Sequence, residues 1–167
     1  PTLFDSLLGA HKILMKGLVP KSGHFRSGAV GILKGTQVSH VAPKAAIVPE
    51  LVANLLGYLK KSKDLALIKS CVFHYEFEFI HPFDDGNGRM GRLWQTLILT
   101  KFNPIFEYIP VESQIHAHQV EYYRILEACD KKGDSTKFIE WMLRLILKSL
   151  KEFSAVCLPA QIGRAAC

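Results

Sequence analysis

The residues best suited to chemistry are concentrated in one stretch, HPFDDGNGRMGR, over residues 81–92. A histidine, two adjacent aspartates and two arginines surround three glycines there. Glycines let backbone N–H groups approach phosphate oxygens closely, and the N-terminus of a helix that follows them attracts an anion. The stretch therefore predicts a phosphate site at the start of a helix.

Each charged residue of this stretch suits phosphate chemistry. Arg89 and Arg92 are three residues apart, so both project from nearly the same side of a helix and could clamp phosphate oxygens. Asp85 offers the oxygen ligand with which Mg²⁺ bridges a carboxylate to substrate phosphates. His81, followed by Pro82, could take a proton from an attacking hydroxyl. Each feature alone also occurs in ordinary turns and helix ends, but their combination in one loop favours a functional site.

Two other glycine-rich phosphate motifs are excluded. Gly86, Gly88 and Gly91 have the G-x-G-x-x-G spacing of dinucleotide-binding folds, and Glu107 lies about where a ribose-binding acid would be. No alternation of strands and helices follows, however, and the two aspartates would face a pyrophosphate with no cation between them. A Walker A loop needs a Lys-Ser or Lys-Thr pair after its glycines, and none is present there.

The elements that position the motif are predicted to be mostly helical. Apolar periodicity indicates helices over residues 3–17, 49–61, 64–81, 87–102, 112–132 and 134–153. Thr2 with Asp5, Pro49 and Asp64 supply start signals for the first three. Residues 73–79 also alternate as a strand would, but the length of their segment favours a helix. Two β-branched runs around a glycine turn predict one hairpin over residues 29–41.

Composition indicates one globular domain. The chain has 167 residues, of which 49% are apolar, and its net charge of +6 comes from scattered lysines, so no nucleic-acid binding is expected. No apolar run is long enough to span a membrane, and the N-terminus lacks the order of a signal peptide. The spacings of the four cysteines fit neither a zinc site nor a disulfide framework, which indicates reduced thiols in a cytoplasmic protein.

The motif resembles the signature of the Fic family, His-Pro-Phe-x-(Asp/Glu)-Gly-Asn-Gly-Arg-x-x-Arg, at every specified position. The stretches GHFR, FHYEFEFIHPF, IPVESQI and VEYYRIL are similar to the family as well, so the resemblance covers nearly residues 3–150. It implies a mainly α fold, a Fic-type helical bundle with a small β-hairpin flap. It also implies a catalytic domain over residues 1–153. Residues 154–167 are expected to be a C-terminal tail or the start of a linker, and the lack of an initiator Met leads us to expect a fragment of a longer protein.

The resemblance implies roles for individual residues. His81 would deprotonate a target hydroxyl, Asp85 would bind Mg²⁺ and Phe83 would anchor the loop. The other catalytic and nucleotide-binding residues that it implies are Gly86, Asn87, Gly88, Arg89, Gly91 and Arg92 at the phosphates, and Tyr122 and Tyr123 near the adenine. Core packing is the alternative for the two tyrosines, because adjacent residues of a helix face different ways.

The predicted hairpin resembles the family's flap, whose residues here would be Gly31, Ile32, Leu33, Val38, Ser39 and His40. A target protein would dock on its exposed edge by strand addition, with a Ser, Thr or Tyr hydroxyl near His81. The reaction implied is attack of that hydroxyl on the α-phosphate of ATP, which moves AMP to the target and releases pyrophosphate.

Several alternatives stay open. The same loop could transfer UMP, phosphocholine or phosphate, or could remove AMP, because it reads phosphates and not the base. A module that binds a nucleotide or partner without turnover is another alternative, although such a module needs no base at His81. The sequence holds no match to the family's inhibitory helix. This helix is expected upstream of Pro1, and the alternatives are that a separate protein supplies it or that this protein lacks such control. A homodimer also stays open as the oligomeric state of the protein.

Overall fold

The computed structural model describes residues 2–34 and 37–162, with the side chains of residues 31–41 and 157–162 outside the described part. Its elements are α1 (Leu3–Leu14), β1 (Gly31–Lys34), β2 (Gln37–Val41), η1 (Ala45–Ile47), α2 (Val48–Lys61), α3 (Ala66–Ile80), α4 (Asn87–Phe102), η2 (Pro104–Glu107), α5 (Val111–Ala117), α6 (Gln119–Lys132) and α7 (Thr136–Ile162). The fold is therefore mainly α, as predicted.

The start of α1 follows the sequence prediction in detail. Thr2 and Asp5 form the predicted capping box, in which the Asp5 N–H donates to Thr2 Oγ1 and the Thr2 N–H donates to the Asp5 carboxylate. The helix ends at Leu14 and not at residue 17, because Gly17 adopts a φ of 77° in the turn that follows.

Asp64 is not the predicted cap of α3. Its carboxylate accepts hydrogen bonds from Tyr58 Oη at 2.8 Å, in α2, and from Ser62 Oγ at 2.6 Å, at the C-cap of that helix. The helix begins two residues later, at Ala66, with Leu65 at its N-cap and no side-chain capping bond. The two hydroxyls therefore bind the carboxylate that was predicted to cap the N-terminus of α3.

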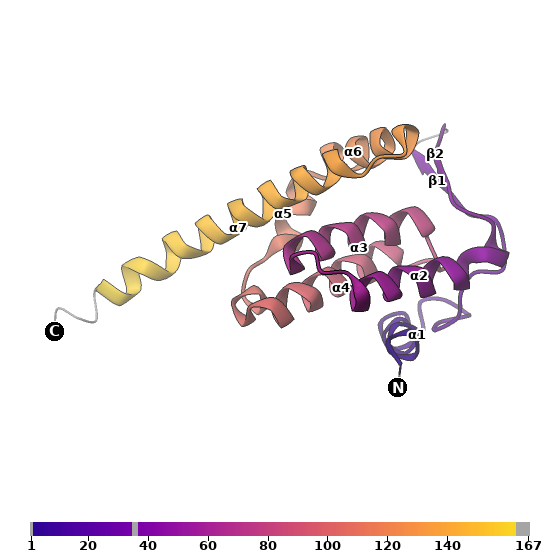
Figure 1. Ribbon diagram of the computed structural model, residues 1–167, viewed down its shortest axis with the longest axis horizontal. Helices are drawn as coiled ribbons and strands as arrows, with labels where there is room; N and C mark the ends of the chain where they lie inside the picture. The colour runs from indigo at the N-terminus through magenta and orange to yellow at the C-terminus, as the bar shows by residue number, and fades with distance from the viewer. Residues whose placement is uncertain (1, 35–36, 163–167) are drawn as a thin grey trace.

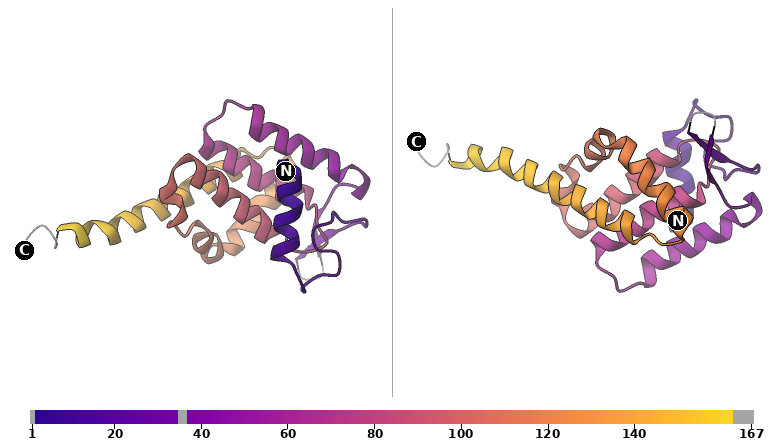
Figure 2. Two further views of the ribbon diagram at one scale, coloured as in Figure 1. Left: turned by 90° about the horizontal axis from the view of Figure 1, so that it is seen from below. Right: turned by 90° about the horizontal axis from the view of Figure 1, so that it is seen from above.

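The helix predicted over residues 112–132 is divided into α5 and α6. His118 separates them with φ −114° and ψ 28°, and its Nδ1 donates to the backbone oxygen of Gln114 at 2.8 Å. The last predicted helix continues past residue 153 to Ile162. Its C-terminal part projects away from the rest of the molecule (Figures 1 and 2), and residues 154–156 are exposed.

Helices α3 and α4 lie side by side in the interior, with α2 and α7 against α3 (Figure 1). The described residues form one apolar cluster between α3, α6 and α7 and another between α1, α2, α3 and α4. One face of α7 is an apolar stripe that is buried, formed by Phe138, Trp141, Met142, Leu145 and Ile146. None of the described helices is both long and apolar enough to cross a lipid bilayer.

Strands β1 and β2 pair antiparallel, within the range of the predicted hairpin. Gly31 lies opposite Val41 and Lys34 opposite Gln37, with a register shift between Ile32 and Leu33. Strand β2 contacts α6. The six residues predicted to form the flap have their side chains outside the described part of the chain, so the flap stays a prediction.

Candidate functional site

The motif loop begins where α3 ends, at His81. This residue adopts φ 49° and ψ 61° at the C-cap, and within the described backbone it is the one non-glycine residue with a positive φ. Its N–H donates to the Phe77 oxygen at 3.0 Å. An L-residue rarely adopts this left-handed conformation, and surrounding contacts must hold it there.

A buried arginine supplies those contacts. The Arg26 side chain donates to four backbone oxygens, His81 O at 2.7 Å, Ile80 O at 3.2 Å, Gly28 O at 2.9 Å and Pro43 O at 2.5 Å. Only 3% of Arg26 is exposed, and burial lowers the pKa of its guanidinium while the charge of Asp84 opposes this shift. The cation therefore satisfies the last carbonyls of α3 and fixes the backbone of His81.

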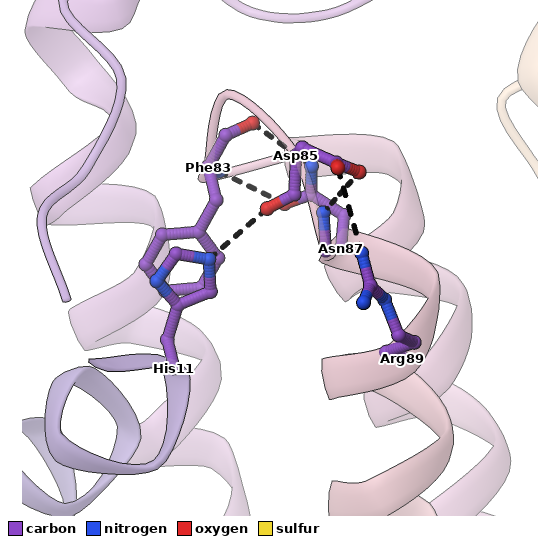
Figure 3. Close-up of polar contacts among 6 residues, drawn as sticks. His11, Phe83, Asp85, Asn87 and Arg89 are labelled. Atoms are coloured by element: carbon purple, nitrogen blue, oxygen red, sulfur yellow. Dashed lines mark hydrogen bonds and ion pairs between the residues drawn. The ribbon is translucent and has the colours of Figure 1, made fainter. Parts of the chain in front are cut away.

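Asn87 closes the loop between Phe83 and the first turn of α4. The Phe83 N–H donates to Asn87 Oδ1, and Asn87 Nδ2 donates to the Phe83 oxygen, both at 2.8 Å (Figure 3). Phe83 is fully buried, as predicted for an anchor, and its ring stacks on that of His11 with centroids 3.6 Å apart. The loop is thus tied down on both sides before any ligand binds.

His11 connects α1 to this loop. Its Nδ1 accepts a hydrogen bond from the Gly23 N–H at 2.8 Å, and its Nε2 lies 3.0 Å from the backbone oxygen of Asp85. Because Nδ1 is the acceptor, Nε2 carries the proton and donates to Asp85, which assigns the tautomer. Figure 3 shows the imidazole against the Phe83 ring with its nitrogen directed at the loop.

Gly86 forms the N-cap of α4 and has to be glycine. Its φ is 87°, and a Cβ there would lie 2.7 Å from Met15 Sδ. No side chain caps the helix at this position, so the N–H groups of its first turn are not bound by a capping side chain. This arrangement suits an anion at the helix start.

The charged side chains of the motif lie around that helix start. Asp85 Oδ2 is 3.4 Å from Arg89 Nη2, and these side chains are 64% and 41% exposed, respectively. Arg92 Nε donates to Glu112 Oε1 at 2.7 Å. Within the described residues no three His, Cys, Asp or Glu side chains form a metal cluster. The exposed carboxylate of Asp85 offers the single protein oxygen ligand that suits a cation sharing its other oxygens with substrate and water, as Mg²⁺ commonly does.

A cavity of about 560 Å³ opens beside Arg92. Glu112, Tyr122 and Tyr123 are among its lining residues. Tyr122 is buried, and its hydroxyl donates to His74 Nε2 at 2.9 Å, while His74 Nδ1 donates to Gln95 Oε1 at 2.6 Å. Burial lowers the pKa of His74 to about 4, opposed by the bond to Gln95 and aided by the charge of Arg92. His74 is thus a packed neutral histidine, and Tyr122 combines core packing with a place on the cavity wall.

The structure brings the predicted residues of the 81–92 motif together in one loop and helix start. Tyr123, which is 42% exposed, lines the neighbouring cavity with Tyr122. Sequence reasoning missed Arg26 and His11 as supports of the loop. Their signals were weak, since one arginine in GHFR and one histidine in α1 carry no spacing that points to residue 81 or 85.

Comparison with known proteins places the chain in a family. The Fic/DOC family model matches residues 2–99. A Fic family protein from Desulfovibrio desulfuricans, known from a crystal structure, superposes with a TM-score of 0.87 at 50% identity, over 92% of this chain and 47% of that one. A probable protein adenylyltransferase of Aquifex aeolicus is 29% identical over an alignment of 170 positions that covers 90% of this chain and 52% of the relative.

A more distant relative is the protein adenylyltransferase fic-1 of Caenorhabditis elegans, 26% identical over 89% of this chain and 28% of the relative. The chain spans about half the length, or less, of these relatives. The match of the family model to more than half of the sequence means that the chain belongs to the Fic/DOC family.

Proposed function

We propose that this member of the Fic/DOC family is a protein adenylyltransferase, which moves AMP from ATP to a Ser, Thr or Tyr hydroxyl of a target protein and releases pyrophosphate. The observation that carries the proposal is the preformed loop, in which Asn87 bonds to both backbone groups of Phe83. The names of the Aquifex aeolicus and Caenorhabditis elegans relatives support the same reaction.

In the proposed reaction the start of α4 binds the phosphates. Backbone N–H groups of its first turn point along the helix axis toward the loop, and Arg89 and Arg92 add two guanidinium groups on one side. Arg89 contacts Asp85 at a long 3.4 Å between exposed groups. Such a pair contributes little, so a phosphate oxygen can take over the guanidinium without a large penalty.

His81 acts as the base. It accepts the proton of the target hydroxyl as the hydroxyl oxygen forms a bond to the α-phosphorus, and the bond from that phosphorus to the bridging oxygen breaks to release pyrophosphate. The contacts of Arg26 to His81 O and Ile80 O hold the backbone from which the imidazole projects. Positioning and charge neutralisation supply most of the catalysis in phosphoryl chemistry of this kind.

Asp85 would hold Mg²⁺. Its carboxylate is exposed beside the helix start, which suits an ion that shares one protein carboxylate with substrate oxygens. When bound, the ion would neutralise negative charge on the phosphates.

The hairpin of β1 and β2 is the proposed docking edge for the target. An extended segment of the target would add to one edge of this two-stranded sheet by backbone hydrogen bonds. An inhibitory helix supplied upstream or by another protein, and a homodimer, stay predictions. The free, buried thiols of Cys71 and Cys129 favour the proposed cytoplasmic location.

Labelled nucleotides test the proposed function. Wild type, His81→Ala and a control, His24→Ala in an exposed loop, are incubated with Mg²⁺, cell lysate and ATP labelled on either the α- or the γ-phosphate. Label should reach protein from α-labelled ATP only, and only when His81 is present. Transfer from γ-labelled ATP would indicate phosphate transfer instead, and ATP binding without transfer would indicate a binding module.

A further inference from the structure

We infer that Glu112 is a positioning residue that fixes the guanidinium of Arg92 for phosphate binding, an inference that rests on the proposed function. Arg92 belongs to α4 and Glu112 to the first turn of α5, 20 residues later. Their contact joins Nε and Oε1 at 2.7 Å, a short charge-assisted hydrogen bond. This contact is much shorter than the 3.4 Å ion pair between Arg89 and Asp85 in the same motif.

The contact sets the plane of the guanidinium. This group is flat and carries one donor on Nε and four on its two Nη atoms, all in a fixed fork. Glu112 binds Nε, while Nη1 lies against the first turn of α4, 3.0 Å from where a Cβ on Gly88 would be. With one edge of the fork bound to α5 and Nη1 at Gly88, the guanidinium is held beside the helix start that is proposed to bind phosphates.

The carboxylate is itself well placed for this role. Its neighbours Val111 and Ile115 are buried in the apolar cluster with α6 and α7, so the backbone of α5 is anchored in the core on both sides of Glu112. The side chain of Glu112 then projects from a fixed base toward Arg92, and both line the same cavity.

Stability alone is a poor explanation for the pair. The Arg92 side chain is 26% exposed and that of Glu112 is 65% exposed, and ion pairs this open to solvent contribute little to folding. The effect of losing Glu112 is therefore expected in nucleotide binding and not in unfolding, which makes the two explanations separable.

The test compares Glu112→Ala and Glu112→Gln with a matched control, Glu107→Gln. Glu107 lines the same cavity but makes no described hydrogen bond or ion pair to Arg92, so its variant removes the same charge from the same wall. The measurements are Kd for ATP by calorimetry, KM and kcat for AMP transfer, and the midpoint of urea unfolding.

Glu112→Ala should raise Kd and KM for ATP about tenfold, since loss of orientation weakens productive contacts, with a smaller change in kcat and an unchanged unfolding midpoint. Glu112→Gln should recover most of the affinity, because its amide oxygen still accepts from Nε. Glu107→Gln should behave as wild type. Tighter ATP binding by Glu112→Ala would overturn the inference, because the carboxylate would then compete with phosphate.

A double-mutant cycle tests whether Glu112 acts through Arg92. Lysine at residue 92 keeps the charge but has no Nε donor, so Glu112→Ala should add no further loss in the Arg92→Lys background. Additive losses would overturn the inference, and if Arg92→Lys binds too weakly for the cycle, recovery by Glu112→Gln decides. Wild type that neither binds ATP nor transfers AMP would refute the proposed function, whereas active wild type with Glu112 variants equal to Glu107→Gln would refute this inference alone.

Discussion

Replacement of Arg26 by methionine should loosen the backbone of His81. Methionine fills a similar space without any donor, so the oxygens of His81, Ile80, Gly28 and Pro43 all lose their guanidinium contacts. His81 would then keep its left-handed conformation against fewer restraints.

The size of the effect follows from the burial of the guanidinium. Hydrogen bonds from a charged donor each contribute about 1.5–3 kcal/mol, but four bonds from one side chain are not additive. Arg26→Met removes the charge itself and leaves neutral backbone oxygens without their donor, and each buried acceptor left unpaired costs about 1–3 kcal/mol. We therefore expect Arg26→Met to lower the free energy of unfolding by about 4 kcal/mol, and Arg26→Lys, which keeps the charge but fewer donors, by about half as much.

Urea unfolding followed by the fluorescence of the buried Trp94 and Trp141 measures this change. The matched control is Arg124→Met, since Arg124 is exposed and makes a single 3.6 Å ion pair with Glu121. It should shift the free energy of unfolding by less than about 0.5 kcal/mol.

The same variants report on the site. Under conditions where Arg26→Met remains folded, its kcat for the proposed AMP transfer should fall on the order of 100-fold, because a base displaced by about 1 Å loses its alignment. If the free energy of unfolding of Arg26→Met lies within about 1 kcal/mol of the wild-type value, and the variant transfers AMP at the wild-type rate, then Arg26 does not hold His81 in place.

Three further predictions concern the loop and its surroundings. Gly86→Ala should destabilise the protein by about 2–4 kcal/mol and abolish ATP binding, measured by urea unfolding and calorimetry, because its Cβ would meet Met15 and its φ suits glycine. Asn87→Ala should remove both bonds to Phe83 and reduce AMP transfer at least about 100-fold in a kinetic assay, whereas an effect under threefold would contradict a clamp. For His74, the folded protein has a pKa of about 4 against an ordinary 6.5, so the folded state binds fewer protons between these values and stability falls as the pH decreases through that window. The loss should approach about 3 kcal/mol at pH 4 in pH-dependent unfolding, and His74→Gln should flatten the profile.

Local signals allowed much of the fold and site to be predicted. The capping box of Thr2 and Asp5 and the start of α4 at Asn87 both depend on residues a few positions apart, and the structure has both. Asp64 was assigned wrongly because two hydroxyls outside its helix compete for its carboxylate. Polar groups whose partners lie far away in the sequence are equally hard to assign from the sequence alone.

The supports of the site could not be predicted because they come from distant parts of the chain. Arg26 bonds to an oxygen 55 residues later and His11 to one 74 residues later. The partners are backbone carbonyls, which every residue carries, so no pattern of side chains marks the pairing. Only the packing of α1 and the loop after it against the motif brings them together.

Through the contact of His11, helix α1 supports the motif loop, although the two contact residues are 74 positions apart in the sequence. A protease that cut α1 free, or a fusion that pulled it out of place, would remove the imidazole from under Phe83 and leave the sequence of the motif untouched. Deletion of about the first dozen residues should therefore abolish the proposed AMP transfer, because the loop relaxes. The cause would not be apparent from residues 81–92, whose sequence is unchanged.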